Sequence, residues 1–337
     1  MSTHRELQQT IAEMVDDERG ILAMDESAPT IKKRFDAIAV ESTEENRRSF
    51  RAMLLNTPGL GRYISGVILF EETLGQRDDS GAALPAVAAA QRIVPGIKVD
   101  KGTGPLSGAP GDLVTRGLDG LGERLQGYKE QGARFAKWRE VYPITDANPT
   151  PLGITANAEV LARYAAVCQE LGIVPIVEPE VLMDGVHEIE RCAMVTAEVQ
   201  HAVFDALRRH GVSFELMLLK PNMVTPGKGC RRAAPEEVAE ETLKIMRRSV
   251  PAAVPSVNFL SGGQGAEEAT ANLNAINQLR GASPWQLSIS YGRALQQPAL
   301  QAWLGKPENL ESAQQALLKR ARLNSLARRG KYATDME

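Results

Sequence analysis

Lysine and carboxylate residues of this 337-residue chain lie at the ends of short apolar runs. The clearest case is Lys220, which follows FELMLL at residues 214–219. Burial among apolar groups and the presence of neighbouring cations both favour the neutral form of a lysine, and a neutral amine is a nucleophile. Lys220 is therefore a candidate for covalent addition to a carbonyl compound, with formation of a Schiff base.

Carboxylates that such chemistry requires close two other runs. Asp25 lies at the end of GILAMDE, and Glu178 and Glu180 lie near the end of VPIVEPEV. Side chains alternate across a strand, so residues two apart share one face and the two glutamates should lie together. If one is ion-paired and the other is crowded by its twin, their pKa values differ, which separates an acid from a base. We expect these three carboxylates to serve the proton transfers around Lys220.

Basic side chains occur in two further runs with the same spacing. Lys98 and Asp100 end VPGIKVD, and Lys137 and Arg139 lie in ARFAKWREV. A charged residue at a single strand end is most often the point where the chain meets water. Charged residues at most strand ends, several of them as same-face pairs, instead favour a functional site. Lys98 and Lys137 are expected to supply positive charge beside Lys220.

Two glycine-containing segments near the end of the chain predict a phosphate site. Glycines let backbone amide groups approach an anion closely, and an arginine pairs with the anion's charge. Tight turns would also explain the glycines, but barrel enzymes often bind phosphate with the loops after the last two strands. The candidates are Ser261, Gly262 and Gly263 in LSGGQG, and Ser290, Gly292 and Arg293 in SYGRA.

Metal and serine-hydrolase chemistry have little support in the sequence. His4, His187, His201 and His210 show no HxH or HxxxH spacing, and no metal ligand is predicted. His187, in MDGVHE after the fifth run, is expected to lie on a surface loop. No GxSxG motif, the sequence sign of a serine-hydrolase nucleophile elbow, occurs.

Apolar, β-branched runs of strand length must position these residues. The segments between them mostly have apolar residues at spacings of three and four, which indicates amphipathic helices. Strands that alternate with helices indicate parallel β/α units, and eight such units favour a closed (β/α)8 barrel of the α/β class. The expected strands are residues 20–26, 65–71, 94–100, 133–141, 174–181, 214–222, 256–263 and 285–292.

One domain, residues 1–337, is expected to contain all of these elements. Its barrel strands would span about residues 20–292, with a surface helix before them and a helical extension over 296–337. An open doubly wound sheet is the rival architecture, and its usual sign is a glycine fingerprint after the first strand. DESAPT occupies that position here, which favours the barrel.

Composition favours a soluble, cytoplasmic protein that acts on small molecules. The formal net charge is −3 and 43% of residues are hydrophobic, so no electrostatic argument favours binding to nucleic acid or an anionic membrane. No apolar run approaches the roughly 20 residues of a membrane helix. Cys168, Cys192 and Cys230 have no close pairing, as expected in a reducing compartment.

With these motifs in view, the sequence resembles class I fructose-bisphosphate aldolase. The resemblance runs through GILAMDES, GVILFEETL, GIKVDKG, FAKWR, GIVPIVEPE, LLKPNMVTPG, FLSGGQ, NLNAIN, SYGRAL and NSLARRGKY. It implies an eight-stranded β/α barrel that uses no metal or other cofactor beyond the covalent Schiff base. It also implies reversible cleavage of fructose 1,6-bisphosphate to dihydroxyacetone phosphate and glyceraldehyde 3-phosphate.

The resemblance assigns catalytic roles to five residues of this sequence. Lys220 would form the Schiff base, and Glu178 would act as acid and base during dehydration of the carbinolamine, with help from Glu180. Asp25 would take the proton from the C4 hydroxyl during cleavage. Lys137 would contact the substrate hydroxyls beside the bond that breaks.

Binding roles are implied for the phosphate groups at both ends of the substrate. Arg139 would support Lys137, and the glycine-containing segments would hold the 1-phosphate. The resemblance implies Ser261, Gly262, Ser290, Gly292 and Arg293 for the 1-phosphate, while Gly263 stays a candidate from the glycine pattern, and the residues near the 6-phosphate are Ser27, Thr30, Arg34 and Lys98.

One departure from the family pattern and two alternative functions stay open at the level of the sequence. The chain lacks the terminal tyrosine of many animal and plant members, and Tyr332 in GKY is not assigned its role. The alternatives are a class I aldolase for another phosphorylated ketose and a non-catalytic scaffold on the same barrel. The family resemblance also implies a homo-oligomer, commonly a tetramer.

Overall fold

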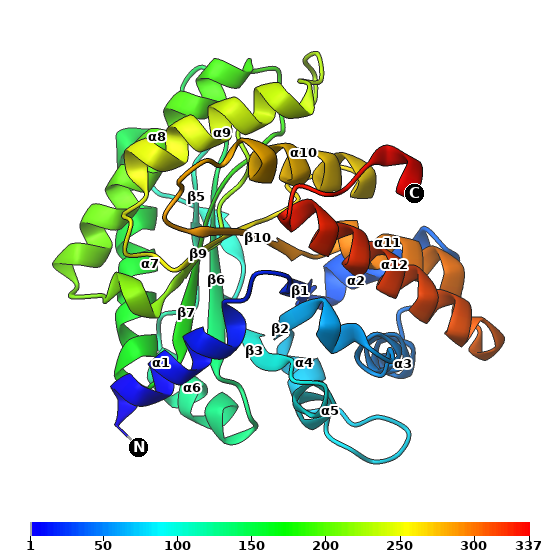
Figure 1. Cartoon of the computed structure of the whole chain (residues 1–337). Helices are drawn as coiled ribbons and strands as arrows, with labels where there is room; N and C mark the ends of the chain where they lie inside the picture. Colours follow the sequence, from blue (N-terminus) through cyan, green and yellow to red (C-terminus); the bar gives the residue numbers. More distant parts are fainter. Residues whose placement is uncertain (1) are drawn as a thin grey trace.

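The apolar runs form a closed parallel barrel in the computed structural model, which describes residues 2–337. Eight strands surround the barrel axis in the order β1-β10-β9-β8-β7-β6-β3-β2, and Figure 1 shows helices around them. The predicted (β/α)8 barrel is therefore confirmed. Its strands are β1 (Gly20–Met24), β2 (Ile64–Leu69), β3 (Val94–Lys98), β6 (Phe135–Tyr142), β7 (Val174–Val181), β8 (Leu218–Leu219), β9 (Ser256–Phe259) and β10 (Gln286–Tyr291).

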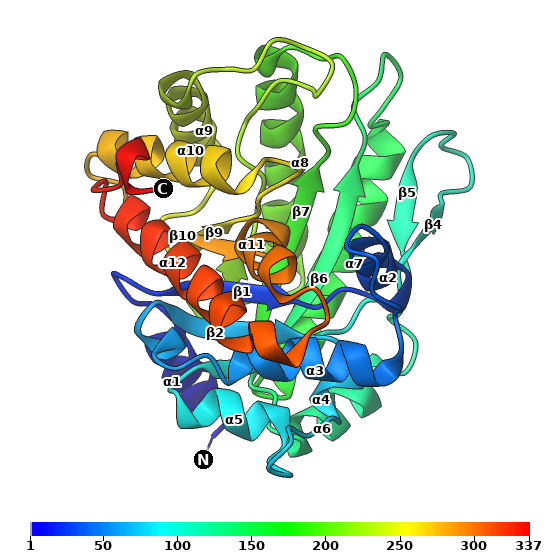
Figure 2. The ribbon, with the colours of Figure 1, turned by 90° about the vertical axis from the view of Figure 1, so that its right-hand side faces the viewer.

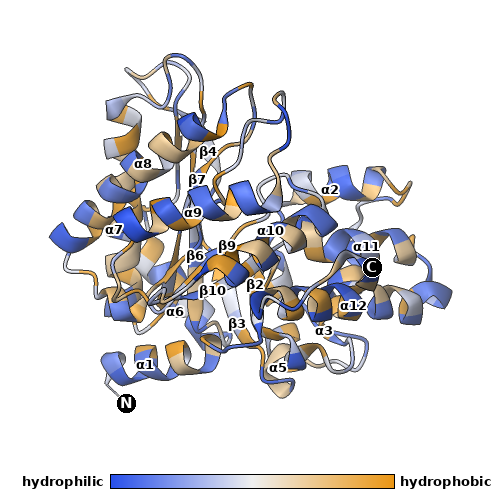
Figure 3. Cartoon of the chain, turned by 45° about the horizontal axis from the view of Figure 1, so that its top comes forward, coloured by the Kyte–Doolittle hydropathy of each residue, from blue (hydrophilic) through white to orange (hydrophobic). Residues whose placement is uncertain are grey.

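Helices surround the barrel and pack one apolar face against it. In α8, buried Cys192, Val195, Val199 and Val203 recur at spacings of three and four residues. Figure 3 shows that α8, α9 and α12 each contain both hydrophilic and hydrophobic residues, as amphipathic helices do. The helices are α1 (Thr3–Met14), α2 (Ala28–Asp36), α3 (Glu44–Leu55), α4 (Glu71–Leu74), α5 (Leu84–Ala90), α6 (Leu121–Glu130), α7 (Pro151–Glu170), α8 (Ile189–Arg209), α9 (Pro235–Ser249), α10 (Ala266–Leu279), α11 (Arg293–Trp303) and α12 (Leu310–Arg328), with short 3-10 turns at Leu60–Arg62, Phe214–Leu216, Pro307–Asn309 and Thr334–Met336.

The strand predicted at residues 214–222 is much shorter than expected. Phe214–Leu216 forms a 3-10 turn, and only Leu218–Leu219 forms the strand β8. The Gln169 side chain accepts from the N–H of Ser213 and donates to the carbonyl of Leu216, so these backbone groups are satisfied outside the barrel ladder. A continuous apolar run cannot reveal this difference, because strand and buried turn have the same composition.

The interior of the barrel is filled by apolar side chains. Ile21, Ile68, Phe135 and Ile176 belong to this cluster, and none is more than 1% exposed. Gly96 makes room for Phe135, since a Cβ atom at Gly96 would lie 2.3 Å from its ring. A packed interior leaves no channel, so polar chemistry is confined to the ends of the barrel.

Helix α1 closes the amino-terminal end of this interior. Leu7 and Met14 are buried in the same cluster as the strand side chains, and Figure 1 shows α1 in dark blue beside the barrel. The expected surface helix therefore has a buried face with a structural function. Met1, the first residue of the expected domain, lies outside the described residues.

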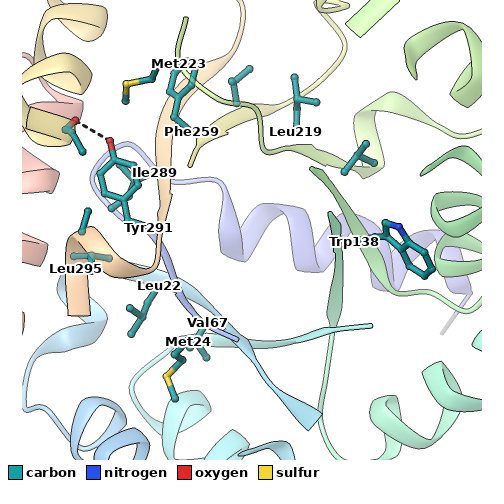
Figure 4. Close-up of a cluster of buried hydrophobic side chains, with 14 of the residues drawn as sticks. Leu22, Met24, Val67, Trp138, Leu219, Met223, Phe259, Ile289, Tyr291 and Leu295 are labelled. Carbon is teal, nitrogen blue, oxygen red and sulfur yellow. Dashed lines mark hydrogen bonds between the residues drawn. The ribbon is translucent and has the colours of Figure 1, made fainter. Parts of the chain in front are cut away.

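A second apolar core lies between the strands and the outer helices. Figure 4 shows Trp138, Leu219, Phe259 and Tyr291 pointing outward from their strands into it. Each is fully buried, and the Tyr291 hydroxyl donates to the Ala269 carbonyl of α10 at 2.9 Å. Strands buried on both faces explain why the sequence shows continuous apolar runs instead of alternation.

A two-stranded hairpin absent from the sequence prediction follows β3. It pairs β4 (Thr103–Pro105) antiparallel with β5 (Leu113–Thr115), and Figure 2 shows it in cyan beside the carboxyl end of β6. Three-residue strands are too short for a periodic signal to identify. The helical extension expected from residue 296 also begins earlier, at Arg293. Within residues 2–337 no helix is both long and apolar enough to cross a membrane.

Candidate active site

The carboxyl ends of the barrel strands surround a cavity of about 790 Å³. Every residue proposed from the sequence lines it, although these residues are spread along the chain from Asp25 to Arg293. Parallel strands place their carboxyl ends at one rim, which explains the convergence. The residues are Asp25, Ser27, Thr30, Arg34, Lys98, Lys137, Arg139, Glu178, Glu180, Lys220, Ser261, Gly262, Gly263, Ser290, Gly292 and Arg293.

Lys220 lies directly after β8, at the base of the cavity. Its N–H donates to the Val177 carbonyl of β7 at 2.8 Å, which continues the barrel ladder by one residue. Only 4% of Lys220 is exposed, and its Nζ lies 3.1 Å from Glu178 Oε1. The amine therefore has a carboxylate in direct reach and little access to bulk water.

Lys137 joins Glu178 to Asp25. Its Nζ lies 3.0 Å from Glu178 Oε2 and 2.7 Å from Asp25 Oδ2. Lys137 and Glu178 are each 3% exposed, and the Asp25 side chain is 13% exposed. Two carboxylates and two amines thus form one buried chain of alternating charge: Asp25, Lys137, Glu178 and Lys220.

The charges of this chain stabilise one another. Burial alone would raise the pKa values of Asp25 and Glu178, but Lys137 and Lys220 hold both pKa values below their ordinary range. Burial would lower the pKa of Lys137, but Asp25 and Glu178 raise it above its ordinary value. Asp25 and Glu178 are therefore ionised at neutral pH, and Lys137 is a cation.

Glu180 has a different partner from Glu178. The guanidinium of Arg139 donates to Glu180 Oε2, and Glu180 is 9% exposed. Burial would lower the pKa of Arg139, but Glu180 and Glu178 raise it above its ordinary value. The two glutamates thus have separate environments because each pairs with its own cation, whereas the sequence interpretation had one ion-paired and the other crowded by its twin.

Lys98 is held by the residue two positions later. Its Nζ lies 2.7 Å from Asp100 Oδ1 and 3.0 Å from the Asp100 carbonyl. Lys98 and Lys137 are neighbours across β3 and β6, yet each has a carboxylate partner. The positive charge expected beside Lys220 is therefore largely balanced by Asp25, Glu178 and Asp100.

Both glycine-containing segments open onto the cavity. Gly262 and Gly263 have φ angles of +49° and +86°, a left-handed conformation that favours glycine. The N–H groups at the start of α11, after Gly292, point toward the same region, and a helix amino terminus favours an anion. The hydroxyl of Ser290 is buried without a hydrogen-bond partner. This end of the cavity has the donors that a phosphate group requires.

A second set of polar groups lies at the start of α2. The hydroxyl oxygens of Ser27 and Thr30 lie 3.2 Å apart, and Arg34 Nη1 donates to Glu26 Oε1 at 2.6 Å. Ser27 precedes the first helical residue, so the free N–H groups of α2 lie nearby. This region could bind a second anion.

Glu26 is the main site residue that sequence reasoning missed. Its carboxylate accepts from Arg34 and from Gln296 at 2.7 Å, and its carbonyl accepts from buried Arg51 at 2.8 Å. The position of Glu26 directly after Asp25 in MDES could have marked it as a site residue. Its partners in α3 and α11 could not be inferred from the sequence. Other lining residues that were not named as candidates are Ala23, Pro29, Lys33, Phe70, Glu71, Lys101, Gly102, Thr103 and Leu260.

His187 is not on the surface, contrary to the prediction. It is 9% exposed, and neither ring nitrogen has a hydrogen-bond partner. Its carbonyl accepts from Gly227, which joins the loop after β7 to the loop after Lys220. This loop pairing, invisible in the sequence, buries the ring. In residues 2–337 no group of three or more histidine, cysteine or acidic residues could hold a metal ion.

Comparison with known proteins finds similarity over nearly the whole chain. A model of the family described as fructose-bisphosphate aldolase class-I matches residues 6–337. Cytosolic fructose-bisphosphate aldolase 4 of Arabidopsis thaliana is 56% identical over 320 residues, which cover 95% of this chain and 81% of that protein. Fructose-bisphosphate aldolase B of Gallus gallus is 53% identical over 318 residues, 94% of this chain and 88% of that protein.

The similarity extends to a solved structure. Fructose-bisphosphate aldolase from Plasmodium falciparum, in complex with TRAP and a small-molecule inhibitor, has a TM-score of 0.96 and 51% identity to this chain. The match covers 98% of this chain and 96% of that chain. Sequence and fold therefore agree.

Proposed function

Because the chain belongs to the class I fructose-bisphosphate aldolase family, whose members are metal-independent lyases, we propose that it cleaves fructose 1,6-bisphosphate reversibly. The products are dihydroxyacetone phosphate and glyceraldehyde 3-phosphate. The observation that carries the mechanism is the position of Lys220, a buried amine 3.1 Å from Glu178 at the base of a cavity with two anion-binding ends.

The first half of the reaction forms the Schiff base. Lys220 gives one proton to Glu178 and attacks the C2 carbonyl carbon as a neutral amine, and Glu178 passes that proton to the carbonyl oxygen, which becomes a hydroxyl group. Glu178 accepts a proton from the nitrogen and returns one to that hydroxyl, which leaves as water. Glu180 and Arg139 lie beside Glu178 and support its position. The imine that remains is protonated and attracts electrons far more strongly than a ketone.

The second half breaks the bond between C3 and C4. Asp25 takes the proton of the C4 hydroxyl, C4 becomes an aldehyde, and the electron pair moves toward the imine to form an enamine. Lys137 lies between Asp25 and Glu178, where its charge can stabilise the oxygen atoms beside that bond. Protonation of the enamine at C3 and hydrolysis with water release dihydroxyacetone phosphate and restore Lys220.

Phosphate groups orient the substrate at both ends. We assign the 1-phosphate to Ser261, Gly262, Gly263, Gly292 and Arg293, with the unpartnered hydroxyl of Ser290 beside them. The 6-phosphate end is assigned to Ser27, Thr30, Arg34 and Lys98. Holding both ends fixes C2 at Lys220 and lowers the entropic cost of reaching the transition state.

Trapping of the imine tests this assignment directly. We expect borohydride, added with dihydroxyacetone phosphate, to attach the substrate irreversibly to Lys220 and to abolish turnover. Peptide mass spectrometry locates the adduct, and Lys220→Met should give none. Lys244→Met is the matched control, because Lys244 is an exposed lysine of α9 that pairs with Glu241. An adduct on another lysine, or none on the wild type, would defeat the mechanism.

Two further measurements separate the alternatives. Turnover of fructose 1,6-bisphosphate and of fructose 1-phosphate distinguishes the bisphosphate enzyme from an aldolase for another ketose phosphate. Activity retained in EDTA is the result expected for a class I enzyme. If neither sugar is turned over, the result favours the alternative of a non-catalytic scaffold on this barrel.

The cellular setting is part of the proposal. The cytosolic name of the Arabidopsis relative supports a cytoplasmic location, and the proposed partners are phosphorylated sugars, not nucleic acid or membrane. We also propose a homo-oligomer, with the tetramer as the expected state. Light scattering of the purified protein measures the oligomeric state.

A further inference from the structure

A buried carboxylate on the outer face of β6 has no role in the mechanism above. Glu140 is 0% exposed, and its side chain points away from the face that carries Lys137 and Arg139. Oε1 accepts from the indole N–H of Trp138 at 2.8 Å, and Oε2 accepts from the backbone N–H of Thr115 at 3.0 Å. Burying a charge without a cationic partner is costly, so a residue of this kind indicates a function.

Thr115 ends strand β5, so Glu140 attaches the β4–β5 hairpin to the barrel. The Thr115 hydroxyl also donates to the carbonyl of Arg139 at 2.7 Å. Glu140 and Thr115 therefore hold the hairpin against β6 at the residue whose side chain pairs with Glu180 in the cavity. Figure 2 shows β5 alongside the upper part of β6.

The attachment continues through the hairpin into the cavity wall. Thr115 pairs with Thr103, the N–H of Lys101 donates to the Arg116 carbonyl at 2.8 Å, and the N–H of Arg116 donates to the Gly102 carbonyl at 2.9 Å. Lys101, Gly102 and Thr103 line the cavity and directly follow the Lys98–Asp100 pair. A shift of β5 would thus move the wall that carries Lys98 and Lys101.

The other end of β5 has an independent attachment. Asn157 of α7 donates to the Leu113 carbonyl at 2.9 Å, and Asp112 accepts from Asn148 and Thr150. Loss of the Glu140 contact is therefore expected to loosen the base of the hairpin while its outer part stays attached. The base is the part that reaches the cavity.

We propose that Glu140 is a positioning residue that fixes the Lys98–Thr103 wall and thereby determines the preference for bisphosphate over monophosphate ketoses. The proposal rests on the proposed function, which assigns Lys98 to the 6-phosphate end. The hairpin pairs with the segment that follows Lys98, whereas the residues assigned to the 1-phosphate follow β9 and β10, so we expect movement of the hairpin to leave the 1-phosphate end in place.

The charge of Glu140 is also unusual. Burial raises its pKa to about 7, although the hydrogen bonds from Trp138 and Thr115 oppose this rise, and the nearby charge of Asp100 adds to it. Tyr142 on the same strand is buried nearby and is uncharged at neutral pH because burial raises its pKa. A glutamine at position 140 replaces one of the two acceptor oxygens by an NH2 group, so only one of the two N–H groups keeps its acceptor in place.

The test compares two substrates in Glu140→Gln. We expect KM for fructose 1,6-bisphosphate to rise about five- to tenfold, the size of one lost buried hydrogen bond. KM for fructose 1-phosphate and kcat for both sugars should stay within about twofold, an interval well below the loss of one such bond. Thr115→Val keeps the backbone N–H that Glu140 accepts and removes the hydrogen bond from the Thr115 hydroxyl to the Arg139 carbonyl. It should change the ratio of the two KM values less than Glu140→Gln does.

Val203→Ala is the matched control, since Val203 is a buried residue of α8 that does not line the cavity. It should lower stability and leave the ratio of the two KM values unchanged. Hydrogen exchange, measured without substrate, should accelerate at residues 101–103 and 113–116 in Glu140→Gln, less so in Thr115→Val, and not in Val203→Ala.

The outcomes distinguish the two proposals. A wild type that turns over neither sugar defeats the proposed function, and the inference with it. An active wild type with an unchanged KM ratio in Glu140→Gln, an equal rise for both sugars, or a loss confined to kcat would overturn the inference alone.

Discussion

At the scale of single residues, the site depends on alternating charge in a dry environment. Lys137 is central, because it contacts Asp25 and Glu178 and keeps both carboxylates ionised despite their burial. Interactions between buried charges are strong because water does not screen them. Each charge in the chain therefore sets the protonation state of its neighbours.

Replacement of Lys137 by methionine should show this coupling. Lys137 lowers the pKa values of Asp25 and Glu178, so its removal raises both, and the acidic limb of the kcat/KM profile moves to higher pH. We expect activity near neutral pH to fall at least about a hundredfold, as for loss of a catalytic acid–base group. The pH–rate profiles of wild type and variant provide the measurement. An acidic limb that stays in place, or moves to lower pH, would contradict the coupling.

At the scale of elements, loops attached to rigid strands shape the ends of the cavity. Gly263 has a φ angle of +86°, and a Cβ atom there would lie 2.9 Å from both Met183 and Lys228. Its loop is therefore confined by the segments after β7 and after Lys220. A defined loop conformation aims backbone N–H groups at one point, as an anion site requires.

Gly263→Ala should weaken binding at the 1-phosphate end. Alanine at this φ angle strains the backbone and displaces the loop, whereas the flexible ends of Met183 and Lys228 can move away from the new methyl group. We expect about tenfold weaker affinity for dihydroxyacetone phosphate, equivalent to about 1.4 kcal/mol. Calorimetric titration measures the affinity. Gly122→Ala in α6 is the control, since a Cβ atom there meets nothing within 4 Å. Equal affinities in wild type and Gly263→Ala would show that the loop tolerates a side chain.

At the scale of the whole molecule, stability and chemistry lie at opposite ends of the barrel. Leu7 and Met14 of α1 pack into the interior cluster at the amino-terminal end, and the charged residues line the cavity at the other end. The apolar side chains that fill the barrel interior separate the amino-terminal end from the cavity. Substitutions at the amino-terminal end should therefore lower stability without changing the geometry of the active site.

Leu7→Ala tests this separation. Removal of a buried leucine side chain should lower the free energy of unfolding by about 2–4 kcal/mol, since the rigid strands cannot close the cavity completely. Urea denaturation measures the loss, and kcat at low temperature should match the wild type. Gln8→Ala, an exposed change on the same helix, should alter neither. A large drop in kcat for folded Leu7→Ala would mean that the two ends are coupled.

Several features followed from sequence alone. The barrel, its strand positions within a few residues and the candidate site residues were predictable, because apolar runs mark buried strands and polar residues mark strand ends. The family motifs added roles for Lys220, Glu178 and Asp25. These features depend on the local composition of each segment and on the order of the segments along the chain, and both can be read from the sequence.

Other features needed the tertiary structure. Only the fold revealed that Lys137 joins Asp25 to Glu178, that His187 is buried, and that Glu26 binds Arg34. Likewise, the apolar run before Lys220 contains a 3-10 turn because Gln169 satisfies its backbone. Each depends on a contact between residues far apart in the chain, and local patterns carry no information about the partner. Sequence thus determined which groups meet at the rim, and the fold decided which of them pair.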